Sequence, residues 1–246
     1  MSLDLIIGSV SAGGLSVLTG AGMSTASGLP DFRGRDGLWK RKDPRLLASL
    51  SAMENNRSEF VDFYRYRIRM FEGVKPNRGH HILAEWEARG LLKGIITQNV
   101  DGLHQEAGSM EVHELHGNLR RVRCSRCRAP YDNSLFLERD DCPACGGPLR
   151  PGVVLFGEML PEGPMDAAEE LSGTASSFLV LGSSLEVLSP ANAYPMLAKR
   201  AGAKLFIINM TPTQLDYMAD GVIHGDIVET LEEIEKSVSR GSGRRE

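Results

Sequence analysis

The sequence predicts an α/β fold: a Rossmann-like parallel sheet with helices on both faces, plus a small zinc-binding and helical lobe. Three observations support this prediction. Short apolar runs alternate with helical patterns along most of the chain. A glycine-rich turn, Gly20–Ser24, follows the first run. The only four cysteines lie in two pairs within one polar segment.

Each strand of the predicted sheet is a short apolar run with glycine or polar residues at its ends. Most of these runs carry β-branched residues. We expect them at Leu15–Thr19, Gly94–Thr97, Phe178–Gly182 and Lys204–Asn209. Between and after the strands, apolar residues recur with a helical period. We expect helices at Ser58–Phe71, Arg78–Arg89, Pro190–Arg200 and Ile227–Val238. Strands that alternate with helices favour parallel pairing.

Two stretches interrupt the alternation and predict a second lobe. Residues 35 to about 78 are charged and helical, and residues 119–151 are polar and hold all the cysteines. We therefore interpret the chain as one domain spanning residues 1–246. Its Rossmann-like part is expected at about 1–34, 91–118 and 152–240. Its small lobe is expected at about 35–90 (helical) and 119–151 (zinc ribbon).

The composition argues against several classes of protein. A net charge of −4 gives no electrostatic case for nucleic-acid binding. No apolar run is long enough to span a membrane, and the first residues lack the basic start of a signal peptide. We therefore expect a cytoplasmic location, where paired cysteines are more often metal ligands than disulfides.

The cysteine pairs predict a structural zinc site formed by Cys124, Cys127, Cys142 and Cys145. A site closed by four thiolates has no open position for water, so this zinc should not be catalytic. The competing interpretation is a free-standing ribbon that binds nucleic acid, because five arginines surround the first pair. A solvated basic face explains them better, since no aromatic residues interleave with them.

The other motifs are ambiguous when taken alone. The turn Gly20–Thr25 lacks the third glycine of the dinucleotide fingerprint. The Gln98–Asp101 segment follows a strand, so it fits either a ligand-binding crevice or an ordinary capped turn. His113 and His116 are three residues apart, whereas the zinc-protease motif needs four. A single histidine there could serve as a general base.

Taken together, these motifs resemble the sirtuin family of NAD-dependent protein-lysine deacylases. The similarity covers about residues 15–230, in the family's order. It rests on the segments 20–34, 97–104, 115–117, the four cysteines, 151–158, 182–185 and 208–209. The resemblance implies NAD as co-substrate, one structural zinc per chain, and acyl-lysine proteins or peptides as partners. In this family the segment before the first strand forms a helix, which we expect to be shortened here because that stretch is short and glycine-rich.

The resemblance also implies which residues would bind NAD. The phosphates and ribose oxygens would contact two glycine-containing turns, which hold Gly20, Ala21, Gly22 and Ser24, and Gly182, Ser183 and Ser184. A loop over the nicotinamide ribose would hold Asp31, Phe32 and Arg33. The other expected contacts are Gln98 at that ribose, Asn99 and Asp101 at the nicotinamide, Asn209 at the adenine ribose, and Asp226 and Ile227 at the adenine.

For the reaction, the resemblance implies that the acyl oxygen attacks the ribose carbon that releases nicotinamide. His116 would then act as general base on the ribose hydroxyls. The products would be free lysine, nicotinamide and O-acyl-ADP-ribose. The substrate peptide would add as a strand between two segments of this chain. Those segments are Val154, Phe156, Gly157 and Glu158 on one side, and Leu185, Glu186 and Val187 on the other.

One pair bears on the choice of acyl group. Tyr64 and Arg67 stand where desuccinylating and demalonylating members carry a Tyr-x-x-Arg pair, although Asp31 stands where some of them have threonine. A guanidinium fork matches a carboxylate, so the pair predicts acceptance of succinyl- or malonyl-lysine. The alternative is an amphipathic helix with solvated arginines.

Three function classes remain open at this stage. They are a lysine deacylase, an ADP-ribosyltransferase that uses the same site, and a zinc-ribbon binding module with a degenerate nucleotide site. The presence of His116, Asn99 and Asp101 argues against the third. The sequence leaves the oligomeric state open.

Overall fold

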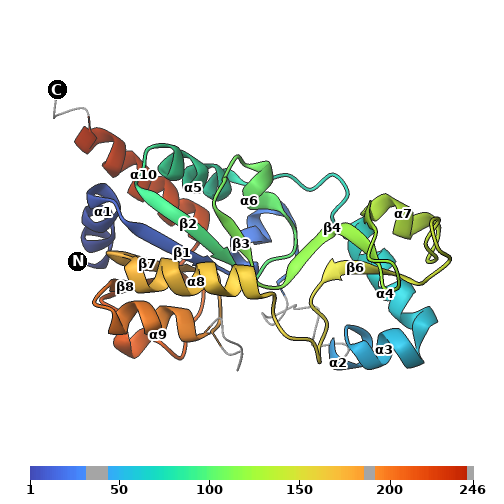
Figure 1. The fold of residues 1–246 in the computed structure, drawn as a ribbon. Helices are drawn as coiled ribbons and strands as arrows, with labels where there is room; N and C mark the ends of the chain where they lie inside the picture. The colour runs from blue at the N-terminus through green and yellow to red at the C-terminus, as the bar shows by residue number, and fades with distance from the viewer. Residues whose placement is uncertain (32–43, 186–191, 243–246) are drawn as a thin grey trace.

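The computed structural model describes residues 1–31, 44–185 and 192–242. Its larger part is a six-stranded parallel sheet with the order β3-β2-β1-β7-β8-β9 (Figure 1). The strands are β1 (Leu15–Thr19), β2 (Leu92–Thr97), β3 (Val112–Glu114), β7 (Ser177–Leu181), β8 (Lys204–Asn209) and β9 (Gly221–His224). The four predicted strands are confirmed as the four central ones. The two edge strands were missed because runs of three and four residues carry little periodicity.

Helices cover both faces of this sheet (Figure 1). Those on one face are α1 (Ser2–Ala12), α5 (Arg78–Ala88) and α10 (Ile227–Ser242), and those on the other are α8 (Glu162–Thr174) and α9 (Ala193–Arg200). Helix α1 has eleven residues, so the segment before β1 forms a helix, as the resemblance implied. Its buried Ile6 and Val10 join the core under α10, which explains why a glycine-containing segment still forms a helix.

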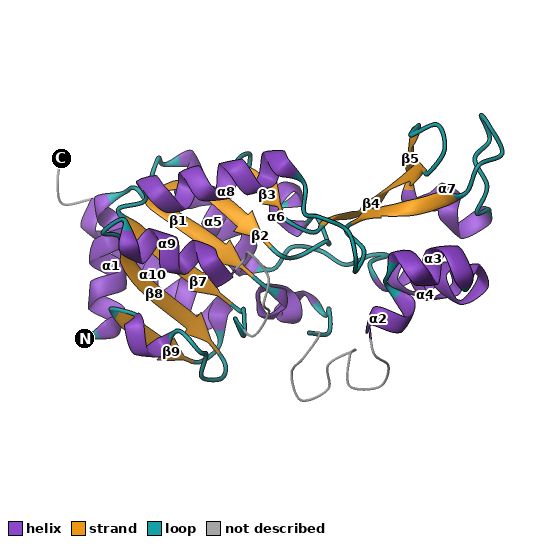
Figure 2. Ribbon diagram, turned by 60° about the horizontal axis from the view of Figure 1, so that its bottom comes forward, coloured by secondary structure: helices purple, strands orange, loops and turns teal. Residues whose placement is uncertain are grey.

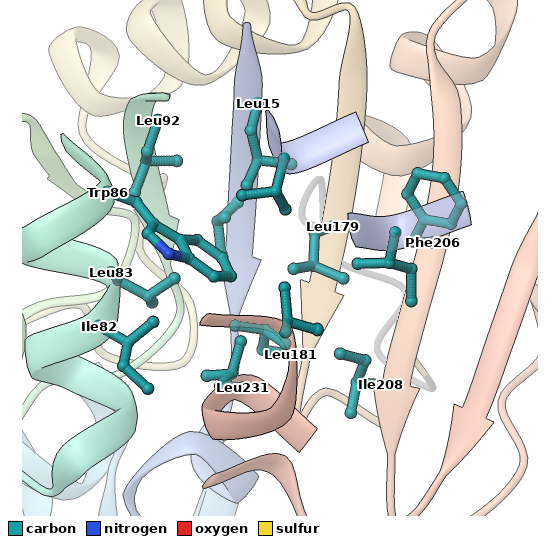
Figure 3. Packing of buried hydrophobic residues seen from close by; sticks show 14 of the residues in the cluster. Leu15, Ile82, Leu83, Trp86, Leu92, Leu179, Leu181, Phe206, Ile208 and Leu231 are labelled. Atoms are coloured by element: carbon teal, nitrogen blue, oxygen red, sulfur yellow. The ribbon is translucent and has the colours of Figure 1, made fainter. Parts of the chain in front are cut away.

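The core on the first face joins α5 and α10 to the middle of the sheet. Figure 3 shows Leu83 and Trp86 of α5 pointing toward the strands, with Leu15 and Leu179 facing them. The sequence analysis assigned residues 35–90 to the small lobe, but α5 packs against the parallel sheet. Three of its side chains, Ile82, Leu83 and Trp86, are almost completely buried in this cluster. The small-lobe helices therefore end before α5.

The small lobe lies beyond one end of the parallel sheet (Figure 2). Among the described residues, it contains an antiparallel sheet of order β5-β4-β6 and four helices. The elements are β4 (Gly117–Cys124), β5 (Pro130–Asp132), β6 (Leu149–Val153), α2 (Pro44–Leu47), α3 (Leu50–Asn55), α4 (Arg57–Met70) and α7 (Asn133–Glu138). One apolar cluster joins Phe60 and Tyr64 of α4 to Phe136 of α7 and to the buried cysteines Cys124 and Cys142. The zinc ribbon and α4 thus share a core.

No helix within the described residues is long and apolar enough to cross a membrane. The short 3₁₀ helix η1 (Ala21–Ser27) follows β1, a four-residue helix α6 (Leu103–Glu106) follows β2, and the 3₁₀ helix η4 (Asp216–Met218) precedes β9. Of these three, η1 lines the cleft described next, with Ala21, Gly22, Thr25 and Ala26.

Candidate active site

A cleft of about 1040 Å³ opens at the carboxyl ends of the central strands, between the parallel sheet and the small lobe. Strand β1 has β2 on one side and β7 on the other, so the chain reverses its direction across the sheet at this point. Open α/β sheets bind their ligands where the strand order reverses. The predicted residues that line the cleft are Ala21, Gly22, Asp31, Tyr64, Arg67, Gln98, Asn99, His116, Val154, Phe156, Gly157, Glu158, Gly182, Ser183, Ser184, Asn209, Asp226 and Ile227.

The two glycine turns touch each other on one wall of this cleft. The amide of Gly22 donates to the carbonyl of Gly182 at 2.9 Å. A Cβ on Gly22 would lie 2.7 Å from the Cα of Gly182, and one on Gly182 would lie 2.5 Å from the Met23 nitrogen. Gly182 also has a φ of 63°, which favours glycine. The two glycine turns, 160 residues apart in the chain, therefore form one continuous part of the cleft wall.

Gln98 follows β2 and extends along the wall toward the second turn. Its Oε1 accepts a hydrogen bond of 3.2 Å from Ser183 Oγ. Its Nε2 is buried and has no partner among the residues that the structure describes. A buried amide donor beside a large cleft suits a ligand hydroxyl or carbonyl. This fits the ribose contact that the resemblance implies for Gln98.

Ser24, Asn99 and Asp101 form a buried polar group at the inner end of the cleft. Ser24 Oγ donates to Asp101 Oδ2 at 2.8 Å, and Asn99 Nδ2 lies 3.0 Å from the carbonyl oxygen of Gly20. Burial raises the pKa of Asp101, against hydrogen bonds from Leu103 and Ser24 that lower it. A smaller cavity beside them is lined by Ser24, Asn99 and Asp101 and by parts of the small lobe. This cavity is small, at about 20 Å³, and it lies directly beside the polar side chains of Asn99 and Asp101.

His116 lies half-buried in the wall of the cleft, just before β4. Its Nδ1 is 2.9 Å from the carbonyl oxygen of Gln98. A carbonyl can only accept, so Nδ1 must carry the proton, and the basic lone pair belongs to Nε2. The fold thus fixes the tautomer that a general base needs.

The far end of the cleft lies at β8 and the start of α10. Asn209 ends β8 and donates from Nδ2 to the carbonyl of Thr211 at 2.7 Å. Asp226 accepts from the Glu229 amide at 2.9 Å and so caps α10. The structure brings Asn209, Asp226 and Ile227 together, as the resemblance implied for an adenosine site.

The predicted peptide-binding segment needs a correction at Phe156. Its amide donates to the Ala48 carbonyl at 2.9 Å, and its carbonyl accepts from the Leu50 amide at 3.1 Å. Phe156 therefore pairs with the loop before α3, and its backbone groups are not available to a peptide.

The opposite predicted segment also differs. Leu185 has a φ of 54°, a left-handed conformation that ends a strand, and its side chain is buried in the core under α8 and α9. Its carbonyl accepts from Asn192. Leu185 is therefore no strand residue in this structure. Glu186 and Val187 lie outside the described residues, and so do Phe32 and Arg33 of the predicted loop.

Tyr64 and Arg67 are both buried on the cleft side of α4. Their exposed fractions are 1% and 7%, and the guanidinium carbon lies 5.7 Å from the Tyr64 ring centroid. Burial raises the pKa of Tyr64 to about 12, and burial lowers the pKa of Arg67. The two side chains line the same cleft as His116, so the alternative of solvated arginines is wrong for Arg67.

Comparisons with known proteins agree with this geometry. The Sir2 family model matches residues 20–189. The chain belongs to the Sir2 family. It is 55% identical to "NAD-dependent protein deacetylase 1" of Geobacillus kaustophilus, over 88% of this chain and 91% of that protein. It is 50% identical to "NAD-dependent protein deacetylase" of Oceanobacillus iheyensis, over 84% and 88% respectively.

Solved Sir2 structures share the whole architecture. A mutant Sir2 homologue in complex with ADP-ribose superposes with a TM-score of 0.92 at 37% identity, covering 98% of both chains. A Sir2 complex with a deacetylated p53 peptide and 3′-O-acetyl-ADP-ribose gives a TM-score of 0.89 at 37% identity, over 96% of this chain and 98% of that one.

The Sir2 cysteine cluster suits a structural zinc ion. The sulfur atoms of Cys124, Cys127, Cys142 and Cys145 all lie within 4.8 Å of one another. Two of the sulfur–sulfur distances, from Cys124 to Cys145 and from Cys127 to Cys142, are 3.5 and 3.7 Å. Four sulfurs at about 2.3 Å from a tetrahedral zinc would be separated by roughly 3.8 Å. The donor set and the spacing therefore both fit.

Several cleft residues of this Sir2 protein were missed by sequence reasoning. Met210 and Thr211 follow β8, and Gly225 follows the edge strand β9, so each comes after a strand end. Their signal was their position after a strand rather than their residue type, and for Gly225 the missed strand β9 hid that signal. His80 and His104 are both buried, and their ring centroids lie 4.8 Å apart.

Proposed function

We propose that this protein is an NAD-dependent protein-lysine deacylase that transfers an acyl group from lysine to ADP-ribose. The observation that supports this proposal most is the tautomer of His116. Its Nδ1 carries the proton, so the basic lone pair is on Nε2, and His116 lies in the wall of the same cleft as Gln98 and Asn99. The Sir2 relatives named as NAD-dependent protein deacetylases agree with it.

Each part of the cleft has a role in this proposal. Gly22 and Gly182, which are in contact and carry no side chains, would let the backbone approach a pyrophosphate closely. Asn99 and Asp101 would hold the nicotinamide carboxamide at the inner end of the cleft. Bound NAD would supply the electrophilic ribose carbon and the hydroxyl that receives the acyl group. His116 Nε2 would take the proton from that hydroxyl.

We further propose that acidic acyl groups such as succinyl and malonyl are accepted. Arg67 lines both cavities, and Tyr64 lies against it. A guanidinium in so buried a place attracts a carboxylate strongly, because little water competes. This finer assignment rests on the site alone, since the named relatives are deacetylases.

The test is mass spectrometry of acetylated and succinylated lysine peptides incubated with and without NAD. The expected result is loss of both acyl groups only with NAD, together with nicotinamide and O-acyl-ADP-ribose. Transfer of label from NAD onto protein, with the acyl groups intact, would instead identify an ADP-ribosyltransferase. The cytoplasmic location stays a prediction from the sequence.

A further inference from the structure

The side chain of Glu158 does not point toward a substrate. Its two carboxylate oxygens accept hydrogen bonds of 2.5 and 2.7 Å from the two terminal nitrogens of Arg150, on strand β6. One of these oxygens also accepts from the Leu155 amide at 2.8 Å. The Arg150 side chain is 5% exposed and that of Glu158 is 20% exposed.

Arg150 also contacts the backbone of the segment 153–158 at Val153. Its Nη2 donates to the carbonyl of Val153 at 2.8 Å. The pair therefore contacts the backbone of Val153 at one end and that of Leu155 in the middle, while Glu158 donates from its own amide to the Leu155 carbonyl at 2.9 Å. Residues 153–158 are closed into one turn by these contacts.

The hydrogen bonds leave a definite set of backbone groups available. The Val154 amide donates to the His116 carbonyl at 2.9 Å, and Phe156 pairs with the loop before α3. Among the residues that the structure describes, no hydrogen bond reaches the Val154 carbonyl or either backbone group of Gly157. These groups lie in a segment that lines the cleft beside His116.

We propose that Arg150 and Glu158 are positioning residues for peptide recognition, whose ion pair holds residues 153–158 so that the Val154 carbonyl and the two backbone groups of Gly157 are available to the substrate. This inference rests on the proposed function. A buried ion pair adds little net stability compared with an apolar pair of the same size. Its carboxylate, however, binds a guanidinium and a backbone amide at once, which an apolar side chain cannot do.

The environment of Glu158 agrees with an ionised carboxylate. Burial alone would raise its pKa, but hydrogen bonds from Arg150 and Leu155 outweigh this and lower the pKa of Glu158. The pair also lies near enough to the Tyr64 phenol to act on its pKa, with Arg150 lowering it and Glu158 raising it. The peptide segment and the proposed acyl pocket therefore meet at this pair.

The experiment uses the full-length protein with two conservative variants, Glu158→Gln and Arg150→Lys. The control is Glu162→Gln, an exposed glutamate four residues further along. A fluorescein-labelled acetyl-lysine peptide reports binding by anisotropy, and steady-state assays give kcat and KM. We expect the peptide Kd and KM to rise about tenfold, the loss typical of one charge-assisted hydrogen bond. The kcat at saturating peptide, the ADP-ribose Kd and the zinc content should stay within twofold of wild type.

Unchanged peptide Kd and KM in both variants, with or without a lower melting temperature, would overturn the inference and leave the proposed function in place. If the variants lose ADP-ribose affinity as much as peptide affinity, the inference is also overturned. Hydrogen exchange on the wild type gives an independent test, because the Leu155 amide should be protected without peptide. Rapid exchange there would contradict the hydrogen bond to Glu158. A wild-type protein that neither binds nor deacylates the peptide would overturn the proposed function itself.

Discussion

His116 and Gln98 are joined by a hydrogen bond of 2.9 Å between the imidazole Nδ1 and a backbone carbonyl oxygen. Gln98 follows β2 and His116 precedes β4, so the bond links the two parts of the chain at the cleft. Because the backbone rather than a side chain accepts it, no substitution at position 98 removes the acceptor. The tautomer of His116 is therefore built into the fold.

We expect His116→Ala to lower deacylation by about two to four orders of magnitude, the usual contribution of a general base. Folding, zinc content and ADP-ribose affinity should stay near wild type, because His116 is only half-buried. The measurement is single-turnover kinetics beside calorimetric binding. His113→Ala, on the edge strand three residues earlier, is the control and should stay active. Near-normal turnover by His116→Ala would rule out its assignment as the base.

Arg67→Met is expected to reduce desuccinylation about ten- to a hundredfold while sparing deacetylation, as roughly 1.5–3 kcal/mol of charged hydrogen bonding is lost. Methionine keeps the length and apolar volume of the buried stem. The measurement is kcat/KM on matched acetyl and succinyl peptides. Arg69→Met, an exposed arginine on the same helix, serves as control. If both activities fall together, or if the wild type ignores succinyl-lysine, Arg67 is no carboxylate anchor.

Cys142→Ser is expected to release zinc and unfold the small lobe, because binding energy at a four-thiolate site is folding energy. The effect should reach the acyl pocket, since Cys142 and Tyr64 share one apolar cluster. Metal analysis and circular dichroism of the purified variant measure both. Asp141→Asn, an exposed neighbour, should keep its metal. Full activity in protein that holds no zinc would contradict this role.

The buried His80 predicts a pH dependence of stability. Burial, with a smaller effect of His81, lowers its pKa from 6.5 to about 4. Between these values the unfolded chain binds a proton that the folded chain does not, so the free energy of unfolding falls as the pH drops from about 6.5 to 4. The full effect is on the order of 3 kcal/mol, and above pH 6.5 the group contributes nothing.

His80→Gln should flatten this slope, because glutamine does not titrate and can still accept at the start of α5 as the capping box requires. Urea unfolding at several pH values measures it. His81→Gln, the exposed neighbour on the same helix, should keep a slope close to that of the wild type. An unchanged slope in His80→Gln would show that other groups cause the acid sensitivity.

The sequence by itself determined the central strands, the main helices and the metal ligands. Strand β8 begins and ends at the residues that the apolar run Lys204–Asn209 predicted. Its apolar residues are buried whichever helices cover the two faces of the sheet. The cysteine cluster was equally local, since the spacing within each pair lets two sulfurs meet at one ion. These features depend on residue type and on spacing along the chain.

Only the tertiary structure decided which polar groups are available for function. Ser24 and Asp101 are 77 positions apart, and no pattern along the chain predicts that their side chains pair. Phe156 was expected to bind a peptide but pairs with the loop before α3, and Glu158 turns inward to Arg150. A backbone amide or a carboxylate can bind any partner within reach, so its partner is fixed only when packing brings distant segments together.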